Sequence, residues 1–319
     1  MVYSVRSMNM KKYIQPILKA IGYYKVKSKW RIRQTARRWQ KEDAERNAKV
    51  RQEIYAIDKR ILPAVQKSGN ITVSLTSHGS RLERVAPYAI YSILQQTVLP
   101  NRIVLNIDQT QWNDDNLPEL IKKLMVAGLE INYCEDVGPH TKLLPTLEKY
   151  PEDIVITVDD DIIYERVMVE ELIRGYHESD KKAIVTRWAV LIIFKEGKMQ
   201  PYSIWPESSP SDPIDTLYGP LGVAGVLYPP HIFTDEVFNK AVYRKLCKTA
   251  DDIWYTIQAY INHIPVYYLR DTIWTANHPV DRYAEYVEQD SDALHFHNIE
   301  NGHNDVQLKN LIDYYHIND

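Results

Sequence analysis

The chain has 319 residues, of which 45% are hydrophobic and 25% are charged, a balance that predicts a globular protein with a substantial core. Two cysteines, Cys134 and Cys247, are too few for a disulfide framework and lack metal-ligand spacing, so we expect both to be packing residues. The net charge of -3 hides an asymmetry, because residues 1–60 hold 17 lysines and arginines against 5 acidic residues. This asymmetry predicts two regions of different behaviour.

The basic N-terminal segment mixes aromatic residues with its lysines and arginines, as in KVKSKWRIRQTARRW (25–39). Such a mix is typical of a helical arm that lies on an anionic membrane surface, and equally of one that packs on the body or on a partner; nucleic acid is not expected. The sequence 41–62 continues as a predicted helix that ends before Pro63. We therefore expect a basic helical extension over residues 1–65.

No apolar run reaches 18 residues, and the first residues lack both the continuous apolar stretch and the cleavage site of a signal peptide. These observations predict a cytoplasmic protein, with a peripheral position on the inner face of the cell membrane if the basic segment binds lipid.

From residue 66 onward, short apolar runs alternate with helical segments. Such alternation predicts an α/β domain over 66–319 with a mostly parallel, Rossmann-like sheet and helices on both faces. The expected strands are Ile71–Thr76, Arg102–Ile107, Leu129–Tyr133 and Ile154–Val158. The expected helices are Pro87–Gln96, Leu117–Ala127 closed by Gly128, and His140–Tyr150 broken near Pro145.

The second half of the domain, 166–319, is less regular. Val185–Phe194 and Tyr218–Tyr228 are expected to be strands or loops, and Thr249–Asn262 is expected to be a helix. The glycine-spaced stretch 219–225 predicts either a wall against a sugar or a tight strand pair. The polar stretch 276–305 predicts a lid.

Three consecutive aspartates, Asp159 to Asp161, follow the fourth predicted strand, where a ligand crevice is expected in a parallel sheet. Adjacent carboxylates repel one another, so a cation or a strong hydrogen-bond network must lie nearby. Alternate side chains of an extended segment point to one side, so Asp159 and Asp161 are expected to converge while Asp160 faces away. Mg²⁺ and Mn²⁺ prefer such oxygens, although an acidic loop or helix cap would also explain the triplet.

The order of several motifs resembles the family 2-type glycosyltransferases of the GT-A fold, of the bacterial surface-polysaccharide kind. The motifs are VSLTSHG (73–79), SILQQT (92–97), PNRIVLNID (100–108), the acidic triplet, and TADDIW (249–254). The resemblance covers roughly residues 70 to 260, and 70–165 is its nucleotide-binding half.

The resemblance implies a metal-dependent enzyme that moves one sugar from a nucleotide sugar, with UDP the leading nucleotide, to a glycan or lipid-linked acceptor in surface polysaccharide biosynthesis. It implies Asp252 as the catalytic base with Asp251 beside it, and Mn²⁺ or Mg²⁺ held by Asp161, Asp159 and a late histidine, His297 or His295. His140 is a further candidate for contact with the diphosphate. The implied donor-binding residues are Thr76, Ser77, His78, Arg81, Asp108, Lys142, Asp159 and Asp160.

Several departures and alternatives remain. The usual small-residue loop is replaced by SHGSR (77–81), and the Q-x-x-R-W signature of polymerising members is absent, which favours a single addition. Direct displacement with Asp252 as base favours inversion over retention. A nucleotidyltransferase would need a glycine-rich loop after the first strand, where only Gly79 stands. A non-catalytic carbohydrate-binding protein on the same fold is another alternative. Finally, Thr249 could cap a helix, with Asp252 in a capping box and no catalytic role.

Overall fold

The structure is a computed structural model that describes residues 23–67, 69–213, 215–272, 279–282, 284 and 302–318, with side chains described from residue 35. The chain divides into two compact units. One contains residues up to 46 together with 281–290, and the other contains 47–280 together with 291–319. The predicted site residues that fall in the described ranges belong to the second unit.

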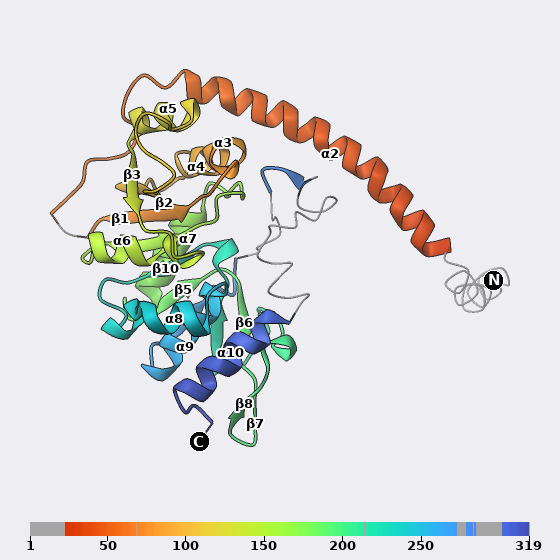
Figure 1. Cartoon of the computed structure of the whole chain (residues 1–319), viewed down its shortest axis with the longest axis vertical. Coiled ribbons are helices and arrows are strands. Elements are labelled where there is room, and N and C mark those ends of the chain that lie inside the picture. Colours follow the sequence, from red (N-terminus) through yellow and green to blue (C-terminus); the bar gives the residue numbers. More distant parts are fainter. Residues whose placement is uncertain are drawn as a thin grey trace. The chain divides into compact units, whose positions relative to one another are not determined.

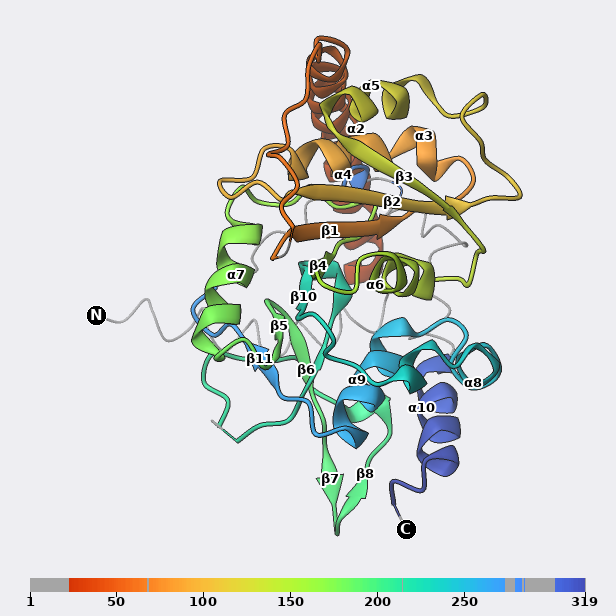
Figure 2. The same cartoon turned by 90° about the vertical axis from the view of Figure 1, so that its left-hand side faces the viewer.

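Among the described residues, seven strands form the central sheet in the order β3-β2-β1-β4-β10-β5-β11 (Figures 1 and 2). All neighbouring pairs are parallel except those of β10, which runs antiparallel to β4 and β5. The predicted fold class, α/β with a mostly parallel, Rossmann-like sheet, is confirmed. The strands are β1 (Ile71–Thr76), β2 (Arg102–Asp108), β3 (Leu129–Cys134), β4 (Ile154–Thr157), β5 (Ile184–Thr186), β10 (Val226–Tyr228) and β11 (Val266–Tyr268).

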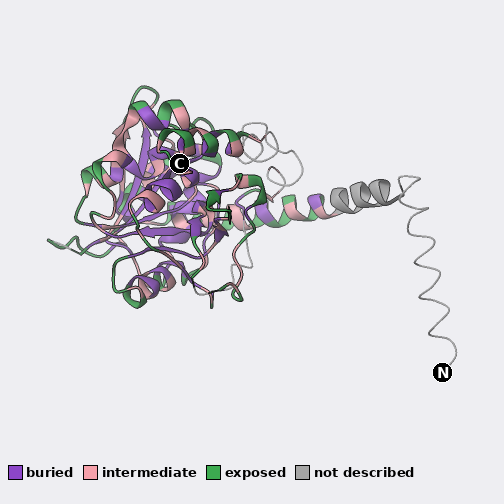
Figure 3. Ribbon diagram, turned by 90° about the horizontal axis from the view of Figure 1, so that it is seen from below, coloured by how far each residue is buried: buried purple, intermediate pink, exposed green. Residues whose placement is uncertain are grey.

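The two faces of the sheet bury separate apolar clusters, because side chains alternate along each strand. Val73 and Leu75 of β1 pack in one cluster with α3 (Arg81–Arg84), α4 (Ala86–Ile93), α5 (Glu119–Ala127) and α7 (Met168–Glu178). The other cluster joins Val155 to α6 (Leu144–Lys149), α8 (Lys240–Leu246), α9 (Asp251–Ile261) and α10 (His303–Tyr314). Figure 2 shows α6 and α7 on opposite sides of the sheet, and Figure 3 shows how deeply its strands are buried.

Two predicted boundaries, one marked by glycine and one by proline, hold closely. Gly128 closes α5 with φ 115°, a left-handed conformation that glycine adopts without strain. The break expected near Pro145 separates the 3₁₀ helix η1 (His140–Lys142) from α6, in which the proline occupies the first turn. This break sets Lys142 apart from the body of α6.

The second half carries small paired strands and short helices, as expected of a less regular region. β6 (Ala189–Leu191) pairs with β9 (Tyr218–Pro220), and β7 (Phe194–Lys195) pairs with β8 (Lys198–Met199). The glycine-spaced stretch forms β9 and the 3₁₀ helix η3 (Gly222–Ala224). Two further 3₁₀ helices are η2 (Tyr202–Ile204) and η4 (Asp235–Phe238).

The N-terminal helix α2 (Tyr23–Tyr55) confirms the helical character of the basic extension. The expectation that the helix continues to residue 62 is wrong. The N–H groups of Ile61 and Leu62 instead donate to the carbonyl of Ala127, at 2.9 and 3.3 Å, so the end of α5 satisfies them. Within the described residues, no helix has the length and apolar character needed to cross a membrane.

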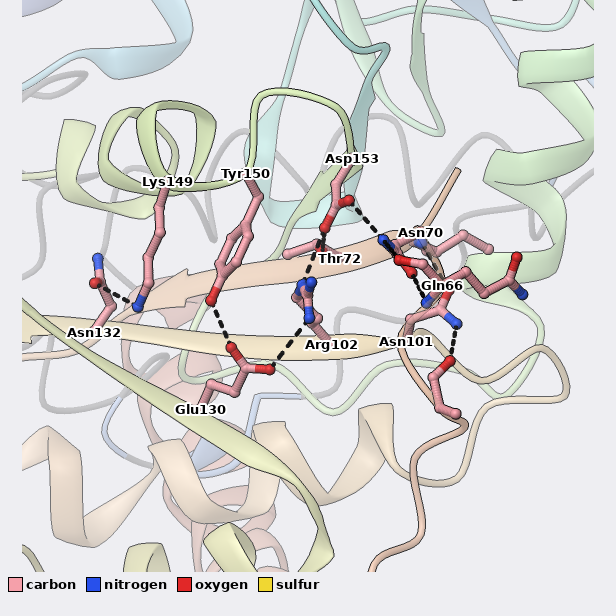
Figure 4. Close-up of polar contacts among 12 residues, drawn as sticks. Gln66, Asn70, Thr72, Asn101, Arg102, Glu130, Asn132, Lys149, Tyr150 and Asp153 are labelled. Carbon is pink, nitrogen blue, oxygen red and sulfur yellow. Dashed lines mark hydrogen bonds and ion pairs between the residues drawn. The ribbon is translucent and has the colours of Figure 1, made fainter. Parts of the chain in front are cut away.

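A polar cluster fastens the strand beginnings, at the end of the sheet away from the acidic triplet (Figure 4). Buried Asp153 accepts hydrogen bonds from Asn70 Nδ2 (3.0 Å), Thr72 Oγ1 (2.7 Å) and Arg102 Nε (3.2 Å). Its oxygens are thus shared between the starts of β1, β2 and β4. We interpret this cluster as structural, because ligands of parallel sheets bind at the opposite, carboxyl end of the strands.

Candidate functional site

Two partly buried cationic side chains form ion pairs with the acidic triplet at the carboxyl end of β4. Lys142 Nζ lies 2.8 Å from Asp159 Oδ1, and Arg81 Nη2 lies 2.5 Å from Asp160 Oδ1 and 2.8 Å from Asp161 Oδ2. Lys142 is the last residue of η1, and Arg81 is the first residue of α3. Both therefore lie next to the carboxyl ends of the strands. The expectation that a cation lies beside these carboxylates is therefore met by the chain's own side chains.

The directions of the three aspartates differ from the expected alternation. Asp159 turns to Lys142, whereas Asp160 and Asp161 share Arg81. Asp160 is also held by Ser77, whose Oγ donates to Asp160 Oδ2 at 2.6 Å. The triplet ends in a turn rather than in an extended strand, so the period-two rule stops applying after Val158.

Burial and carboxylate crowding act on Asp161. Burial is the largest influence and the charge of Asp160 the next, and together they raise the pKa of Asp161 to about 6 despite the attraction of Arg81. The site therefore still carries an excess of negative charge after both cations are counted.

The acidic pair at the start of α9 meets the same lysine. Lys142 Nζ lies 3.4 Å from Asp251 Oδ2, and the N–H of Gly222 donates to Asp252 Oδ1 at 3.1 Å. Burial, followed by the charge of Asp251, raises the pKa of Asp252 to about 7, and Lys142 only partly opposes this. Lys142, whose side chain is only 12% exposed, thus joins the carboxylate after β4 to the pair that opens α9.

Gly222 fits closely between these groups. A Cβ atom at this position would lie 2.8 Å from Lys142 Nζ and 3.1 Å from Asp252 Oδ1, which is too close for an ordinary contact. The glycine spacing of 219–225 indicated a close approach of the backbone, but it could not identify Lys142 and Asp252 as the groups approached. Tyr164 is a second residue of this region that the sequence motifs did not indicate.

The helix-capping alternative for the acidic pair is wrong. The N-cap of α9 is Ala250, which makes no side-chain capping bond, and Thr249 instead bonds Gln307 through its N–H at 2.9 Å. The alternative failed because a tertiary contact with α10 takes the threonine away from the helix end. Asp251 and Asp252 are therefore not members of a capping box.

The prediction that His140 could contact a diphosphate is also wrong. The His140 side chain is fully buried, and its Nε2 lies 2.8 Å from the carbonyl oxygen of Cys247. Its ring stacks on Tyr243 with the centroids 4.6 Å apart, and burial lowers its pKa. His140 therefore packs the interface between η1 and α8.

The remaining predicted donor-binding residues occupy the strand ends, where their donor roles stay predictions. Thr76 Oγ1 donates to the carbonyl of Asn106 at 2.9 Å, and His78 is exposed in the loop after β1. Asp108 Oδ1 accepts both the N–H and the hydroxyl of Thr110 at 2.8 Å, which lowers the pKa of Asp108. The carboxylate of Asp108 is thus engaged in its own turn.

The acidic triplet fits a divalent cation in part. Within the described ranges, no three histidine, cysteine or acidic side chains form a cluster that could hold a metal, and His297 and His295 lie outside these ranges. Asp159 pairs with Lys142 through Oδ1, and Asp161 pairs with Arg81 through Oδ2. The second oxygen of each carboxylate takes no part in these two ion pairs. Mg²⁺ and Mn²⁺ commonly take only one or two protein carboxylates when phosphates supply the rest, so Asp159 and Asp161 suit such an ion.

No protein-family model matches the chain, and no curated protein matches it. Among solved structures, CMP:2-keto-3-deoxy-manno-octonic acid synthetase complexed with CTP aligns with TM-score 0.40 and 12% identity over 64% of this chain and 89% of that one. TarS 1–349 of S. aureus in complex with UDP aligns with TM-score 0.41 and 18% identity over 64% and 58%. GpgS of Mycobacterium tuberculosis, with Mn²⁺, UDP and glucosyl-3-phosphoglycerate, aligns with TM-score 0.29 and 17% identity over 37% and 43%.

The chain thus spans less than two thirds of the length of the last two proteins. Similarity at this level does not decide which substrates the present chain uses.

Proposed function

We propose that the chain is a metal-dependent glycosyltransferase that moves one sugar from a nucleotide sugar, with UDP the leading nucleotide, to a glycan or lipid-linked acceptor. One observation carries the proposal: Lys142 contacts both Asp159 after β4 and Asp251 at the start of α9. Carboxylates suited to a diphosphate and its metal therefore lie beside a second carboxylate pair suited to an acceptor hydroxyl. A displacement reaction needs these two sets of groups on either side of the reacting carbon.

Asp252 is the proposed base. Its carboxylate is buried, its pKa is raised to about 7, and one oxygen is fixed by the Gly222 amide. A base with a pKa near the working pH removes a hydroxyl proton efficiently and is still ionised often enough to act. Direct attack by the deprotonated acceptor inverts the configuration at the sugar carbon.

Lys142 and Arg81 are the proposed cationic contacts of the donor, because both already lie among the carboxylates at the strand ends. When bound by Asp159 and Asp161, Mn²⁺ or Mg²⁺ would supply Lewis-acid neutralisation of the diphosphate leaving group. Ser77 keeps Asp160 directed inward, so Asp160 supports Arg81 rather than reaching for the donor. The SHGSR loop (77–81) thus contributes an arginine where the family pattern has small residues.

Calorimetric titration with UDP, with and without Mn²⁺, tests the proposal. We expect UDP to bind in the presence of Mn²⁺, and Asp161→Ala to abolish the metal-dependent part of the affinity. Asp115→Ala is the matched control, because Asp115 is an exposed aspartate of the same half. Equal UDP affinity with and without Mn²⁺ would count against the proposed mechanism. Consumption of CTP or UTP together with a sugar phosphate would instead indicate a nucleotidyltransferase.

We also propose that the basic N-terminal segment contacts an anionic membrane surface in the cytoplasm, where surface polysaccharides would be assembled. The described part of α2 balances several of its bases with acids one turn away, as in the pairs Arg38–Glu42, Lys41–Glu45 and Lys49–Glu53. Most of the excess positive charge of the extension therefore belongs to residues 1–34, which hold nine lysines and arginines and no acidic residue, whereas 35–60 hold eight against five. Lysines and arginines close to an anionic bilayer each contribute about 1 kcal/mol of attraction.

A further inference from the structure

We propose that Tyr164 is a positioning residue that fixes the turn carrying Asp159 against the loop carrying Gly222. Its catalytic consequence rests on the function proposed above, since these two segments hold the donor-side carboxylate and the amide that binds the base. The hydroxyl of Tyr164 is the link between them. None of the sequence motifs pointed to this residue.

The hydroxyl of Tyr164 uses both of its hydrogen-bonding functions. The N–H of Asp159 donates to Tyr164 Oη at 2.8 Å, and Tyr164 Oη donates to the carbonyl of Val223 at 3.0 Å. The residue is only 3% exposed, so water does not compete for these bonds. A single oxygen atom therefore joins the backbone at the end of β4 to the backbone of η3.

The segment that carries Tyr164 is itself anchored to α4. The N–H of Tyr164 donates to Ser92 Oγ at 3.0 Å, and Ser92 Oγ donates to the carbonyl of Ala89 at 2.6 Å. One turn later, Gln96 Nε2 donates to the carbonyl of Glu165 at 2.8 Å, and the N–H of Val169 donates to Gln96 Oε1 at 3.0 Å. The SILQQT motif thus fixes the segment that carries Tyr164, and the hydroxyl of Tyr164 in turn fixes the two loops.

The contacts close into a ring around the site. Tyr164 joins Asp159 to η3, the Gly222 amide of η3 joins Asp252, and Lys142 joins Asp251 back to Asp159. Ion pairs tolerate small displacements, whereas two hydrogen bonds to one hydroxyl fix direction as well as distance. Removal of the hydroxyl should therefore loosen the spacing between donor and base while the charged contacts of the donor remain.

Tyr164→Phe removes the oxygen and keeps the ring. The matched control is Tyr176→Phe, because Tyr176 is buried in the same apolar cluster and no bond of its hydroxyl to the described residues is recorded. Hydrogen exchange of the unliganded protein is the first measurement. In Tyr164→Phe we expect the Asp159 amide to exchange about tenfold faster than in the wild type, which corresponds to the net contribution of one hydrogen bond, and no change in the control.

Turnover is the second measurement. With UDP-glucose, UDP-galactose and UDP-N-acetylglucosamine as probes, we expect Tyr164→Phe to lower kcat for sugar-nucleotide hydrolysis by about tenfold or more. The Kd for UDP with Mn²⁺ should stay within about twofold of the wild type, because Lys142, Arg81 and the triplet are unchanged. A purely structural role would lower kcat and weaken UDP binding together.

Ser92→Ala serves as a second variant if Tyr164→Phe does not fold, and it should accelerate exchange at Asp159 in the same direction because it releases the Tyr164 backbone. Unchanged exchange at Asp159 in Tyr164→Phe overturns the inference, and so does an unchanged kcat in an active enzyme. If the wild type neither binds UDP nor hydrolyses any of the probes, the proposed function fails on its own. The exchange measurement still decides whether Tyr164 holds the turn.

Discussion

Lys142 and Arg81 together face five carboxylates, so the electrostatics of the site depend on these two side chains. Lys142 is buried between Asp159 and Asp251, and burial of an ammonium group is tolerated only when such partners compensate it. Those neighbouring charges raise its pKa well above the ordinary value although burial acts in the opposite direction. The neighbouring carboxylates therefore favour the charged form of Lys142.

Replacement of Lys142 by methionine should destabilise the protein, because it leaves Asp159 and Asp251 without their cation. Loss of one partner of a buried ion pair typically costs about 3–5 kcal/mol, and we expect a decrease of that size in the free energy of unfolding. Urea denaturation at pH 7.5 measures it. Lys149→Met, an exposed lysine of α6, is the control and should change the free energy by less than about 1 kcal/mol.

The carboxyl group of Asp252 should control the pH dependence of transfer. The base must be ionised to accept a proton, so the rate should fall as the pH decreases below about 7, the pKa to which burial raises this group. Asp252→Asn should bind UDP like the wild type and lose at least about a hundredfold in turnover at pH 8. A fully active Asp252→Asn enzyme would remove Asp252 from the role of base.

The same group should make stability depend on pH in a predictable direction. Asp252 binds its proton more tightly in the folded chain than its ordinary pKa of 3.8 implies, so native stability is lost as the pH rises from 3.8 toward about 7. Asp252→Asn cannot ionise. Its Tm minus that of the wild type should therefore be larger at pH 8 than at pH 5, and a difference independent of pH would contradict the assignment.

Helix α4 stabilises the acidic turn from a distance along the chain. The SILQQT motif, which begins at the end of α4 and continues into the turn after it, supplies Ser92 and Gln96, which bond the segment after the triplet. It also supplies Thr97, whose Oγ1 donates to Glu170 Oε2 at 2.7 Å. The motif supported the family resemblance but gave no indication of this contact. A helix end thus acts as a clamp for the loop that follows β4.

Replacement of Gln96 by alanine tests this clamp at the level of the element. Gln96 is 5% exposed and uses both its oxygen and its nitrogen, so its loss leaves the Val169 N–H unsatisfied and removes one of the two bonds to the Glu165 carbonyl, which the Met168 N–H also contacts. We expect a decrease of about 2–3 kcal/mol in the free energy of unfolding by urea. Gln95→Ala is the matched neighbour, because within the described residues Gln95 is bonded through its backbone, to the Ser92 carbonyl and to Arg166, and not through its side chain. Equal effects of the two substitutions would contradict the clamp.

At the scale of the whole molecule, the N-terminal extension is shared between the two units. Ile54 near the end of α2 is completely buried in the core of the second unit. In the first unit, Arg282 pairs with Asp43 at 2.7 Å and Glu42 at 2.9 Å, and Asp43 is only 4% exposed. A deletion that tests the membrane proposal must therefore end before these residues.

Deletion of residues 1–34 meets this requirement. The shortened chain should keep the Tm of the full chain while it loses binding to vesicles that contain phosphatidylserine, because most of the excess positive charge is removed. Sedimentation with vesicles at two salt concentrations measures the binding, and neutral phosphatidylcholine vesicles are the control. Unchanged sedimentation of the shortened chain with anionic vesicles would refute the membrane proposal.

The sequence by itself determined the local features of this protein. Alternating apolar runs, Gly128 and Pro145 indicated the strands, the helix end and the break before α6, because these signals depend on neighbouring residues. The positions of the acidic triplet and of the pair at α9 could also be predicted. Their order and spacing then indicated the class of fold.

The tertiary structure alone decided what these groups contact. Lys142 could have been a surface lysine, His140 a ligand of the donor and Thr249 a helix cap, and in each case a residue distant in sequence settled the outcome. The roles of Tyr164 and Gly222 follow from the contact between η3 and the end of β4, which the sequence did not indicate. Such contacts depend on long-range packing, which periodicity and local propensity do not encode.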